Sequence, residues 1–218
     1  MKITALTLYH FPSSRSARVR WALHETYGDD YELKTLKLLE GQQYAPEFLE
    51  KNPNHSVPLL EIRWDDGSSQ TMLESTAMVE WLADAYPEKK LAPAPELTRA
   101  RADYLQMMQF AGSWMDALLW QLRMHRDLLP ETESDPRTVQ RAMDKMALEI
   151  EPQLLDRLSK GEYICGDEFS AADILMGHNV NWARIYGLFQ AEEFKAYVGR
   201  LAARPAFRSA FADVAPRS

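Results

Sequence analysis

The chain has 218 residues, and its composition (46% hydrophobic, 26% charged, 11% aromatic) is ordinary for a globular protein, which excludes disordered and low-complexity architectures. It carries 25 Lys and Arg against 32 Asp and Glu, a net charge of −7, which argues against non-specific nucleic-acid binding because such binding needs a basic face. The single cysteine, Cys165, excludes an internal disulfide framework and is too few for a zinc site.

The N-terminal stretch contains no targeting signal. Met1–His10 has one lysine and a short apolar run, without the longer apolar region and small-residue cleavage site of a signal peptide. No run approaches the roughly 18 apolar residues of a membrane span. We therefore expect a cytoplasmic protein with no membrane contact and no nucleic-acid partner.

Strand and helix patterns alternate in the first part of the chain. The chain starts with a predicted strand, Ile3–His10, and a predicted helix, Arg15–Glu25, separated by the break at Pro12–Ser14. The following segments are a weak strand at Tyr31–Leu38, a short helix at Pro46–Lys51, a hairpin of Pro58–Arg63 with Thr71–Leu73, and a helix at Ser75–Tyr86. This order predicts an α/β domain with a mixed sheet over residues 1–86.

Strand patterns end after residue 86. Three prolines in Pro87–Pro95 predict a linker over residues 87–96. Helical spacing then predicts helices at Leu97–Leu129, Val139–Leu158, Ser170–Tyr186 and Ala191–Ala203, with a last turn at Pro205–Ala212. We therefore expect a second, all-helical domain over residues 97–218.

The pair Val57–Pro58 stands at the start of a predicted strand. Proline is tolerated at that position because its missing N–H costs no ladder hydrogen bond. The same pair is compatible with a cis peptide bond, which turns the Val57 N–H and C=O outward to pair with an extended peptide. The sequence leaves both readings open.

The pair Glu74–Ser75 begins a helix directly after a strand. Ser75 is a candidate N-cap, but Met78 three residues later rules out a capping box. Free N–H groups at a helix N-terminus bind carboxylates, and Glu74 can hold an ammonium group. Together they suit the head group of an amino acid, while an ordinary cap remains the alternative.

Ser13, Ser14 and Arg15 lie at the first strand–helix junction. Helix capping is one interpretation; the other is a hydroxyl and a helix N-terminus that stabilise an anion, with Arg15 adding charge. A Ser-His-Asp triad is disfavoured, because the chain has no Gly-x-Ser-x-Gly and nothing in the sequence places any of its five histidines beside these serines. Glycine-rich phosphate loops and metal-ligand spacings are also absent from the sequence.

Ser170–Asp173 has the form of a capping box, with Phe169 and Ile174 placed to form a hydrophobic staple. By itself this motif is structural.

Taken in order, these segments resemble the cytosolic glutathione transferases, and the resemblance spans most of the chain. Tyr163–Asp173 is similar to the family's signature in the helical domain. Ser13–Arg20 is similar to the zeta-class motif Ser-Ser-Cys-x-x-Arg-Val-Arg, as are Gly41–Gln43 and Asn52–Pro53. Arg15 replaces the motif's cysteine, which weakens an assignment as a maleylacetoacetate isomerase. A bacterial serine-type pattern, Ser-Arg-Ser-x-Arg-Val, fits as well and draws attention to Ser14.

The resemblance implies a thioredoxin-like domain, an all-helical domain, and glutathione as co-substrate. The γ-glutamyl carboxylate would meet Ser75, its ammonium Glu74, and the cysteinyl backbone Val57 beside Pro58. Gln43 or His55 would approach the glycyl end. Ser13 or Ser14 would donate a hydrogen bond to the thiol, with Arg15 nearby. The residues expected to line an apolar electrophile pocket between the domains are Tyr104, Met108, Ala111 and Met115.

These implications predict a glutathione transferase that activates the thiol as thiolate for attack on a hydrophobic electrophile, with a homodimer and a detoxifying role typical of the family. The thiolate is the nucleophile, so no protein nucleophile or metal is needed, and Cys165 is expected to be a buried core residue. The alternatives are a glutathione-dependent cis–trans isomerase and a non-catalytic glutathione-fold binding protein. Retention of Ser13, Val57, Glu74 and Ser75 together argues against the last.

Overall fold

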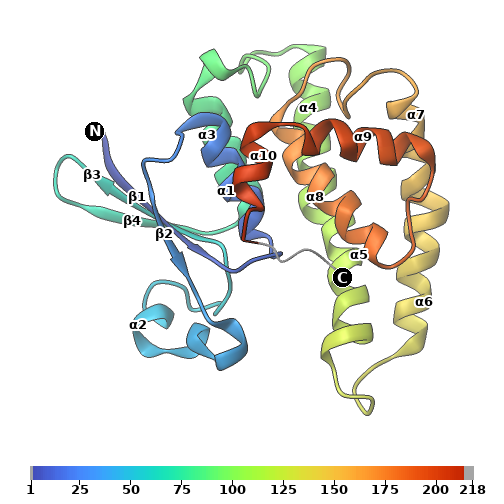
Figure 1. Cartoon of the computed structure of the whole chain (residues 1–218), viewed down its shortest axis with the longest axis horizontal. Helices are drawn as coiled ribbons and strands as arrows, with labels where there is room; N and C mark the ends of the chain where they lie inside the picture. Colours follow the sequence, from blue (N-terminus) through green and yellow to red (C-terminus); the bar gives the residue numbers. More distant parts are fainter. Residues whose placement is uncertain (1, 214–218) are drawn as a thin grey trace. The chain divides into compact units, whose positions relative to one another are not determined.

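The structure is a computed structural model that describes residues 2–213 (Figure 1). Its contacts divide the chain into two compact units. The first unit joins the residues up to Lys89 to the segment that starts at Arg204, and the second comprises Lys90–Ala203. The division after Lys89 falls inside the segment 87–96, which the sequence analysis predicts as a linker.

A four-stranded mixed sheet forms the centre of the first unit, in the order β2-β1-β3-β4. β1 pairs in parallel with β2 and antiparallel with β3, and β3 pairs antiparallel with β4. The strands are β1 (Ile3–His10), β2 (Glu32–Thr35), β3 (Leu59–Trp64) and β4 (Ser69–Met72). The mixed sheet is confirmed, although β2 is shorter than the predicted strand and β4 begins two residues earlier.

Helices cover this sheet, and the alternation of side chains along β1 decides which residues each helix meets. Tyr9 faces one side of the sheet, in an apolar cluster that also contains Leu36, Phe48 and Leu59. His10 therefore faces the opposite side, where α1 (Ser16–Thr26) packs against β1. The helices of this part are α1 (Ser16–Thr26), α2 (Pro46–Leu49) and α3 (Ser75–Ala85), with short 3-10 turns η1 (Leu38–Glu40), η2 (Gln42–Tyr44) and η3 (Pro87–Lys89).

The last helix, α10 (Pro205–Ala210), packs on α1 and belongs to the first unit (Figure 1). The sequence analysis places this segment in the helical domain 97–218. The indole of Trp21 on α1 meets the rings of Phe207 and Phe211, with centroids 4.9 and 6.3 Å apart, and is fully buried. Helical spacing alone could not reveal this attachment, because it shows which face of a helix is apolar and not what covers that face.

The second unit is all-helical, as predicted. Its first helical stretch matches the predicted helix Leu97–Leu129 but includes π-helical turns, and Asn179 donates to the Ala111 carbonyl within one of them at 2.7 Å. The elements are α4 (Arg99–Gln109), η4 (Phe110–Met115), α5 (Asp116–Arg123), η5 (Met124–Leu128), α6 (Pro136–Lys145), η6 (Met146–Ile150), α7 (Glu151–Leu158), α8 (Ala171–Ile185) and α9 (Glu192–Ala202).

The predicted capping box begins α8. The Ser170 N–H donates to Asp173 Oδ2 at 2.9 Å, and the buried Asp173 carboxylate also accepts from the Ile164 N–H at 2.8 Å and the Tyr197 hydroxyl at 2.9 Å. Asp173 thus ties a loop and α9 to the start of α8, which is a structural role. Cys165 lies in the same loop and is partly buried, whereas the sequence analysis expects a buried core residue.

Candidate functional site

One end of the sheet gathers the segments that the sequence analysis singles out. Because β1 and β2 are parallel and β3 and β4 are antiparallel to their neighbours, β1, β2 and β4 end, and β3 begins, on the same side. The strand pairs at this end are Tyr9↔Leu59, His10↔Thr35 and Leu60↔Met72. The loops that carry Ser13, Val57 and Ser75 therefore leave the sheet at one end.

The chain reverses between β1 and α1 through the turn Phe11–Ser14, here called the serine turn. The Ser14 N–H donates to the Phe11 carbonyl at 3.3 Å, with Pro12 and Ser13 at the central positions. Ser13 has φ of 59°, in the left-handed region that follows proline in a type II turn and suits few residues other than glycine. Its side chain is exposed and makes no hydrogen bond to any residue in 2–213.

Ser14 differs from Ser13, because its hydroxyl is engaged within the turn. Ser14 Oγ lies 2.7 Å from the Phe11 carbonyl oxygen and 2.7 Å from Ser16 Oγ, and it accepts from the Ser16 N–H at 3.2 Å. Ser16, the first residue of α1, is fully buried, and its Oγ lies 2.8 Å from His10 Nδ1. The Ser14 hydroxyl thus has two acceptors within its own segment, the Phe11 carbonyl oxygen and Ser16 Oγ.

His10, the last residue of β1, links this hydroxyl pair to the C-terminal segment. Its Nε2 lies 2.9 Å from Asp213 Oδ2, and Arg20 NH1 lies 2.7 Å from the same oxygen. Burial lowers the pKa of His10, while Asp213 acts in the opposite direction. Nothing in the sequence places a histidine beside the serines, but the structure does so at His10, because the short turn brings the last strand residue against the first helical residue.

Ser16, His10 and Asp213 have the residue types of a hydrolase triad without its accessibility. Ser16 and His10 are both 0% exposed, so no substrate carbonyl can reach Ser16 Oγ. The serine also faces Nδ1 of the ring, whereas in the serine-protease template it faces Nε2. A nucleophilic role for Ser16 is therefore excluded by its surroundings. Sequence reasoning missed all three residues.

The Val57–Pro58 peptide bond is cis, one of the two readings that the sequence leaves open. Val57 is half-buried and packs on the cluster around Tyr9, while Pro58 is buried. Asn52, itself buried, donates from Nδ2 to the Ser56 carbonyl at 2.8 Å and so fastens the loop that leads into the proline. The backbone of Val57 is thereby held at the end of the sheet that carries the serine turn.

Gln43 and His55, the two candidates for the glycyl end, lie in the connection between β2 and β3. The Oε1 atom of Gln43 is buried and has no hydrogen-bond partner among residues 2–213. His55 is exposed with φ of 44°, and its ring lies 5.0 Å from that of Tyr44. Of the two residues, Gln43 is therefore the one with a buried oxygen that can still accept a hydrogen bond from a ligand.

Glu74 and Ser75 open α3, where no side chain caps the first turn. Glu74 is exposed with φ of 70°, and Ser75 is buried. Arg18, a buried guanidinium on α1, donates from NH1 to Ser75 Oγ at 3.4 Å. Because Ser75 Oγ accepts that bond, its own hydrogen can be donated to a ligand, and the cation beside it favours an anion. Arg15, directly before α1, is half-buried.

Comparisons with known proteins show the family of this chain. The sequence models "Glutathione S-transferase, N-terminal domain" and "Glutathione S-transferase, C-terminal domain" match residues 8–90 and 116–205. A zeta-class glutathione S-transferase of Euphorbia esula is 33% identical over 82% of this chain and 76% of its own length. This chain belongs to the glutathione S-transferase family.

Two further relatives refine the comparison for this family member. A protein of Drosophila melanogaster named as a probable maleylacetoacetate isomerase is 31% identical over 81% of this chain and 68% of its own length. The structure of a sphingomonad glutathione S-transferase complexed with glutathione superposes with a TM-score of 0.77, at 27% identity, over 94% of this chain and 97% of that one. The expected family and fold class are therefore confirmed.

The residues expected to line an electrophile pocket lie in the core of the second unit. Tyr104, Met108, Ala111 and Met115 are all 0% exposed. They belong to α4 and η4, which pack against α8. The large exposed rings of the same helical stretch are Trp114 and Trp120. Core packing is the role that the structure gives the four residues, and their part in an electrophile pocket stays a prediction.

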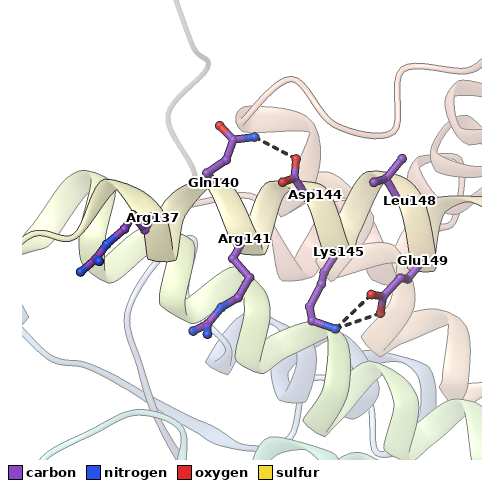
Figure 2. Close-up of a pocket in the computed structure, with 7 residues that line it drawn as sticks. All are labelled: Arg137, Gln140, Arg141, Asp144, Lys145, Leu148 and Glu149. Carbon is purple, nitrogen blue, oxygen red and sulfur yellow. Dashed lines mark hydrogen bonds and ion pairs between the residues drawn. The ribbon is translucent and has the colours of Figure 1, made fainter.

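A hollow of about 450 Å³ runs along α6 and η6 in the second unit (Figure 2). Figure 2 shows Arg137, Arg141 and Lys145 on one side of the helix, with Lys145 Nζ 3.0 Å from Glu149 Oε1. One continuous helical stretch supplies the whole lining, and none of its charged side chains is buried. The hollow therefore lacks the buried polar groups of a built ligand site.

Within residues 2–213, no helix is long and apolar enough to cross a membrane. No three His, Cys, Asp or Glu side chains of these residues are grouped so as to hold a metal ion.

Proposed function

We propose that this chain is a serine-type glutathione transferase in which Ser13 donates the hydrogen bond that activates the glutathione thiol. The observation that carries the choice of Ser13 is the contrast between two neighbouring hydroxyls. Ser13 Oγ is exposed and without a partner in residues 2–213, whereas Ser14 Oγ lies 2.7 Å from each of two acceptors in its own segment. A hydroxyl has one hydrogen to donate, so Ser14 has none left for a ligand.

The proposed chemistry starts from thiol ionisation. A free thiol has a pKa of about 8.5, so only a few per cent is thiolate at neutral pH. A hydrogen bond from Ser13 and the positive end of α1 both favour the charged form and lower that pKa. With an aryl halide, the thiolate sulfur forms a bond to the ring carbon and the halide leaves with its bonding electrons. Each unit of pKa lowering increases the thiolate fraction up to about tenfold.

The other site residues hold the rest of glutathione in this proposal. The γ-glutamyl carboxylate accepts from the Ser75 hydroxyl and the N–H groups that open α3, and Glu74 takes the ammonium. The Val57 backbone pairs with the cysteinyl unit as an added strand, from the loop that the Asn52 side chain fastens at this end of the sheet. Gln43 takes the glycyl end in preference to His55, because its buried Oε1 lacks a partner among residues 2–213. Arg15 adds positive charge beside the serine turn.

A second candidate reaction is glutathione-dependent cis–trans isomerisation, which the relative named as a probable maleylacetoacetate isomerase favours. There the thiolate adds to a conjugated double bond, the resulting single bond rotates, and elimination returns the thiolate. Arg15 in place of the zeta-class cysteine makes conjugation the first choice. A non-catalytic glutathione-binding protein is the third reading.

Turnover of 1-chloro-2,4-dinitrobenzene with glutathione tests the proposal, and turnover of maleylacetone tests the isomerase reading. Ser13→Ala should raise the pKa of bound glutathione's thiol by about one unit with its dissociation constant nearly unchanged. The matched variant Ser14→Ala, which removes a hydroxyl of the turn but leaves that of Ser13, should raise this pKa by less than Ser13→Ala does. Identical thiolate titrations of wild type and Ser13→Ala would move the catalytic assignment to Ser14, and binding without turnover of either substrate would favour the third reading.

The proposal extends to the setting of the enzyme. We propose a cytoplasmic homodimer with a detoxifying role, which takes a hydrophobic electrophile as its second substrate. The free Cys165 suits a reducing compartment. Sedimentation of the purified chain tests the dimer, and a structure with a bound glutathione conjugate tests the pocket residues Tyr104, Met108, Ala111 and Met115.

A further inference from the structure

A continuous line of hydrogen-bond contacts leads from the serine turn into the C-terminal segment. It passes from Ser14 Oγ to Ser16 Oγ (2.7 Å), to His10 Nδ1 (2.8 Å), and from His10 Nε2 to Asp213 Oδ2 (2.9 Å). His10 and Asp213 are 203 positions apart in the sequence. Their contact joins the first strand to the end of the chain next to the proposed thiol site.

The chemistry of the carboxylate fixes the direction of these hydrogen bonds. Asp213 also lies 2.7 Å from the Arg20 guanidinium, and a carboxylate that faces a guanidinium accepts hydrogen bonds and donates none. His10 Nε2 must therefore carry the hydrogen, and in the neutral ring Nδ1 is then an acceptor. Arg20 and Asp213 are the charged groups that act on this imidazole, and its burial favours the neutral form.

Ser16 has one hydroxyl hydrogen, which we assign to His10 Nδ1 at 2.8 Å because this acceptor is nearer than the Phe11 carbonyl oxygen at 3.2 Å. Its Oγ already accepts from the Phe11 N–H at 3.1 Å and can accept once more, from the Ser14 hydroxyl. The hydrogen of Ser14 then points either to Ser16 Oγ or to the Phe11 carbonyl oxygen. In both cases Ser14 is fastened inside the serine turn, and Ser13 is the hydroxyl left facing outward.

We propose that Asp213 and His10 are positioning residues for the proposed transferase reaction. Asp213 selects the ring tautomer of His10, and that tautomer fixes the hydroxyls of Ser16 and Ser14. The serine turn is thereby held with Ser13 in its left-handed conformation and its hydroxyl exposed. This inference rests on the proposed function, in which Ser13 meets the glutathione thiol.

Removal of the carboxylate should loosen this arrangement. Without Asp213, the His10 ring can carry its hydrogen on Nδ1 and donate to Ser16 Oγ. The Ser16 hydrogen then turns toward Ser14 Oγ or the Phe11 carbonyl oxygen, where it competes with the Ser14 hydroxyl. The serine turn loses its single arrangement, and Ser13 is presented to the thiol less often.

The variant Asp213→Ala tests the inference through bound glutathione. We expect the pKa of the bound thiol to rise by about 0.5 unit or more, roughly a threefold loss of thiolate below that pKa, and kcat to fall in proportion. The dissociation constant of glutathione should change less than twofold. In Asp213→Asn the amide oxygen can still accept a hydrogen bond from His10 Nε2, so the pKa of the bound thiol should lie between the values of wild type and Asp213→Ala. This variant also replaces Asp213→Ala if the alanine variant does not fold.

Asp29→Asn is the matched control. Asp29 Oδ1 pairs with His24 Nδ1 at 2.7 Å in the same unit, but the Asp29 carboxylate is 88% exposed and outside the serine turn. This variant should leave the thiolate titration unchanged. If Asp213→Ala also leaves it unchanged, or lowers only thermal stability and glutathione affinity, Asp213 and His10 are structural and the inference is overturned.

A measurement without glutathione separates this inference from the proposed function. Nitrogen chemical shifts of ¹⁵N-labelled histidine, assigned with a His10→Asn variant, report which ring nitrogen carries the hydrogen. We expect Nε2–H in the wild type and a mixture of tautomers in Asp213→Ala. Nδ1–H in the wild type would overturn the positioning chain. If the tautomers behave as expected but wild type does not lower the pKa of bound glutathione, the proposed function fails instead.

Discussion

Arg204, the residue before α10, donates hydrogen bonds to both carboxylate oxygens of Glu25 on α1. Nε lies 2.7 Å from Oε1 and NH2 lies 2.9 Å from Oε2. The Glu25 side chain is only 10% exposed, and its Oε1 also accepts from Trp21 Nε1 at 2.9 Å. This ion pair, together with the aromatic contacts of Trp21, fastens the last helix to the first.

Glu25→Gln should lower the free energy of unfolding by about 2 kcal/mol, because it removes a two-pronged, charge-assisted interaction and leaves a largely buried guanidinium with a neutral partner. Urea unfolding measures this loss. Glu40→Gln is the matched control, since Glu40 pairs with Lys37 at 3.1 Å with both side chains 68% exposed. We expect less than about 0.5 kcal/mol there. Equal losses in the two variants would contradict the role given to Glu25.

Ser75→Ala should weaken glutathione binding about tenfold or more, because a hydrogen bond to a carboxylate is worth about 1.5–3 kcal/mol. Isothermal titration calorimetry gives the dissociation constant directly. Ser69→Ala, an exposed serine on β4, should bind as the wild type does. Unchanged affinity in Ser75→Ala would remove this residue from the site of the γ-glutamyl carboxylate.

Stability should fall as the pH falls below about 6.5, and His10 should account for a measurable part of the decrease. Burial lowers the pKa of His10 in the folded protein, so in this range the unfolded chain takes up a proton that the folded chain does not. The contribution reaches at most about 1.4 kcal/mol per pH unit. Urea unfolding at several pH values, with His10→Gln for comparison, should show a shallower slope for the variant. If the free energy of unfolding depends on pH equally in wild type and His10→Gln, His10 does not contribute to the loss of stability.

Cys165 should react slowly with thiol reagents in the folded protein. Burial is the main cause that raises the pKa of its thiol, to about 12, so almost no thiolate is present at neutral pH. Reaction with Ellman's reagent should be at least tenfold slower in buffer than in denaturing urea. Cys165→Ser should keep its glutathione-dependent turnover, because the reactive sulfur is that of glutathione. Rapid labelling of the native protein would contradict this environment.

The parts of the fold that depend on local patterns could be predicted from the sequence. The β1 strand, the helices α1, α3 and α8 and the Ser170–Asp173 capping box each depend on residues close to one another in the chain. The π-helical turns did not follow from spacing, because η4 involves a hydrogen bond from Asn179, far along the sequence. The placement of α10 likewise depends on a partner surface, which includes Trp21.

The candidate site also contains residues that local sequence patterns reveal and residues that only tertiary contacts reveal. Ser13, Val57 and Ser75 are visible in the sequence because each stands where a strand meets a turn or a helix. The sequence indicates His10 more weakly. It is the last residue of the predicted first strand, and a short turn separates it from the serine that begins the next helix. Nothing in the sequence indicates Asp213, since its contact with His10 exists only once α10 has packed on α1.

The discontinuity of the first unit has a consequence during protein synthesis. The whole of Lys90–Ala203 is translated between the two parts of this unit. At about 5–20 residues per second, translation of those 114 residues takes roughly 6–23 s. During that time the Trp21 face of α1 lacks Phe207, Phe211 and Arg204. A chain released early by a stop codon anywhere in the second unit would leave this aromatic surface bare, and chaperones that recognise exposed apolar segments would meet it there.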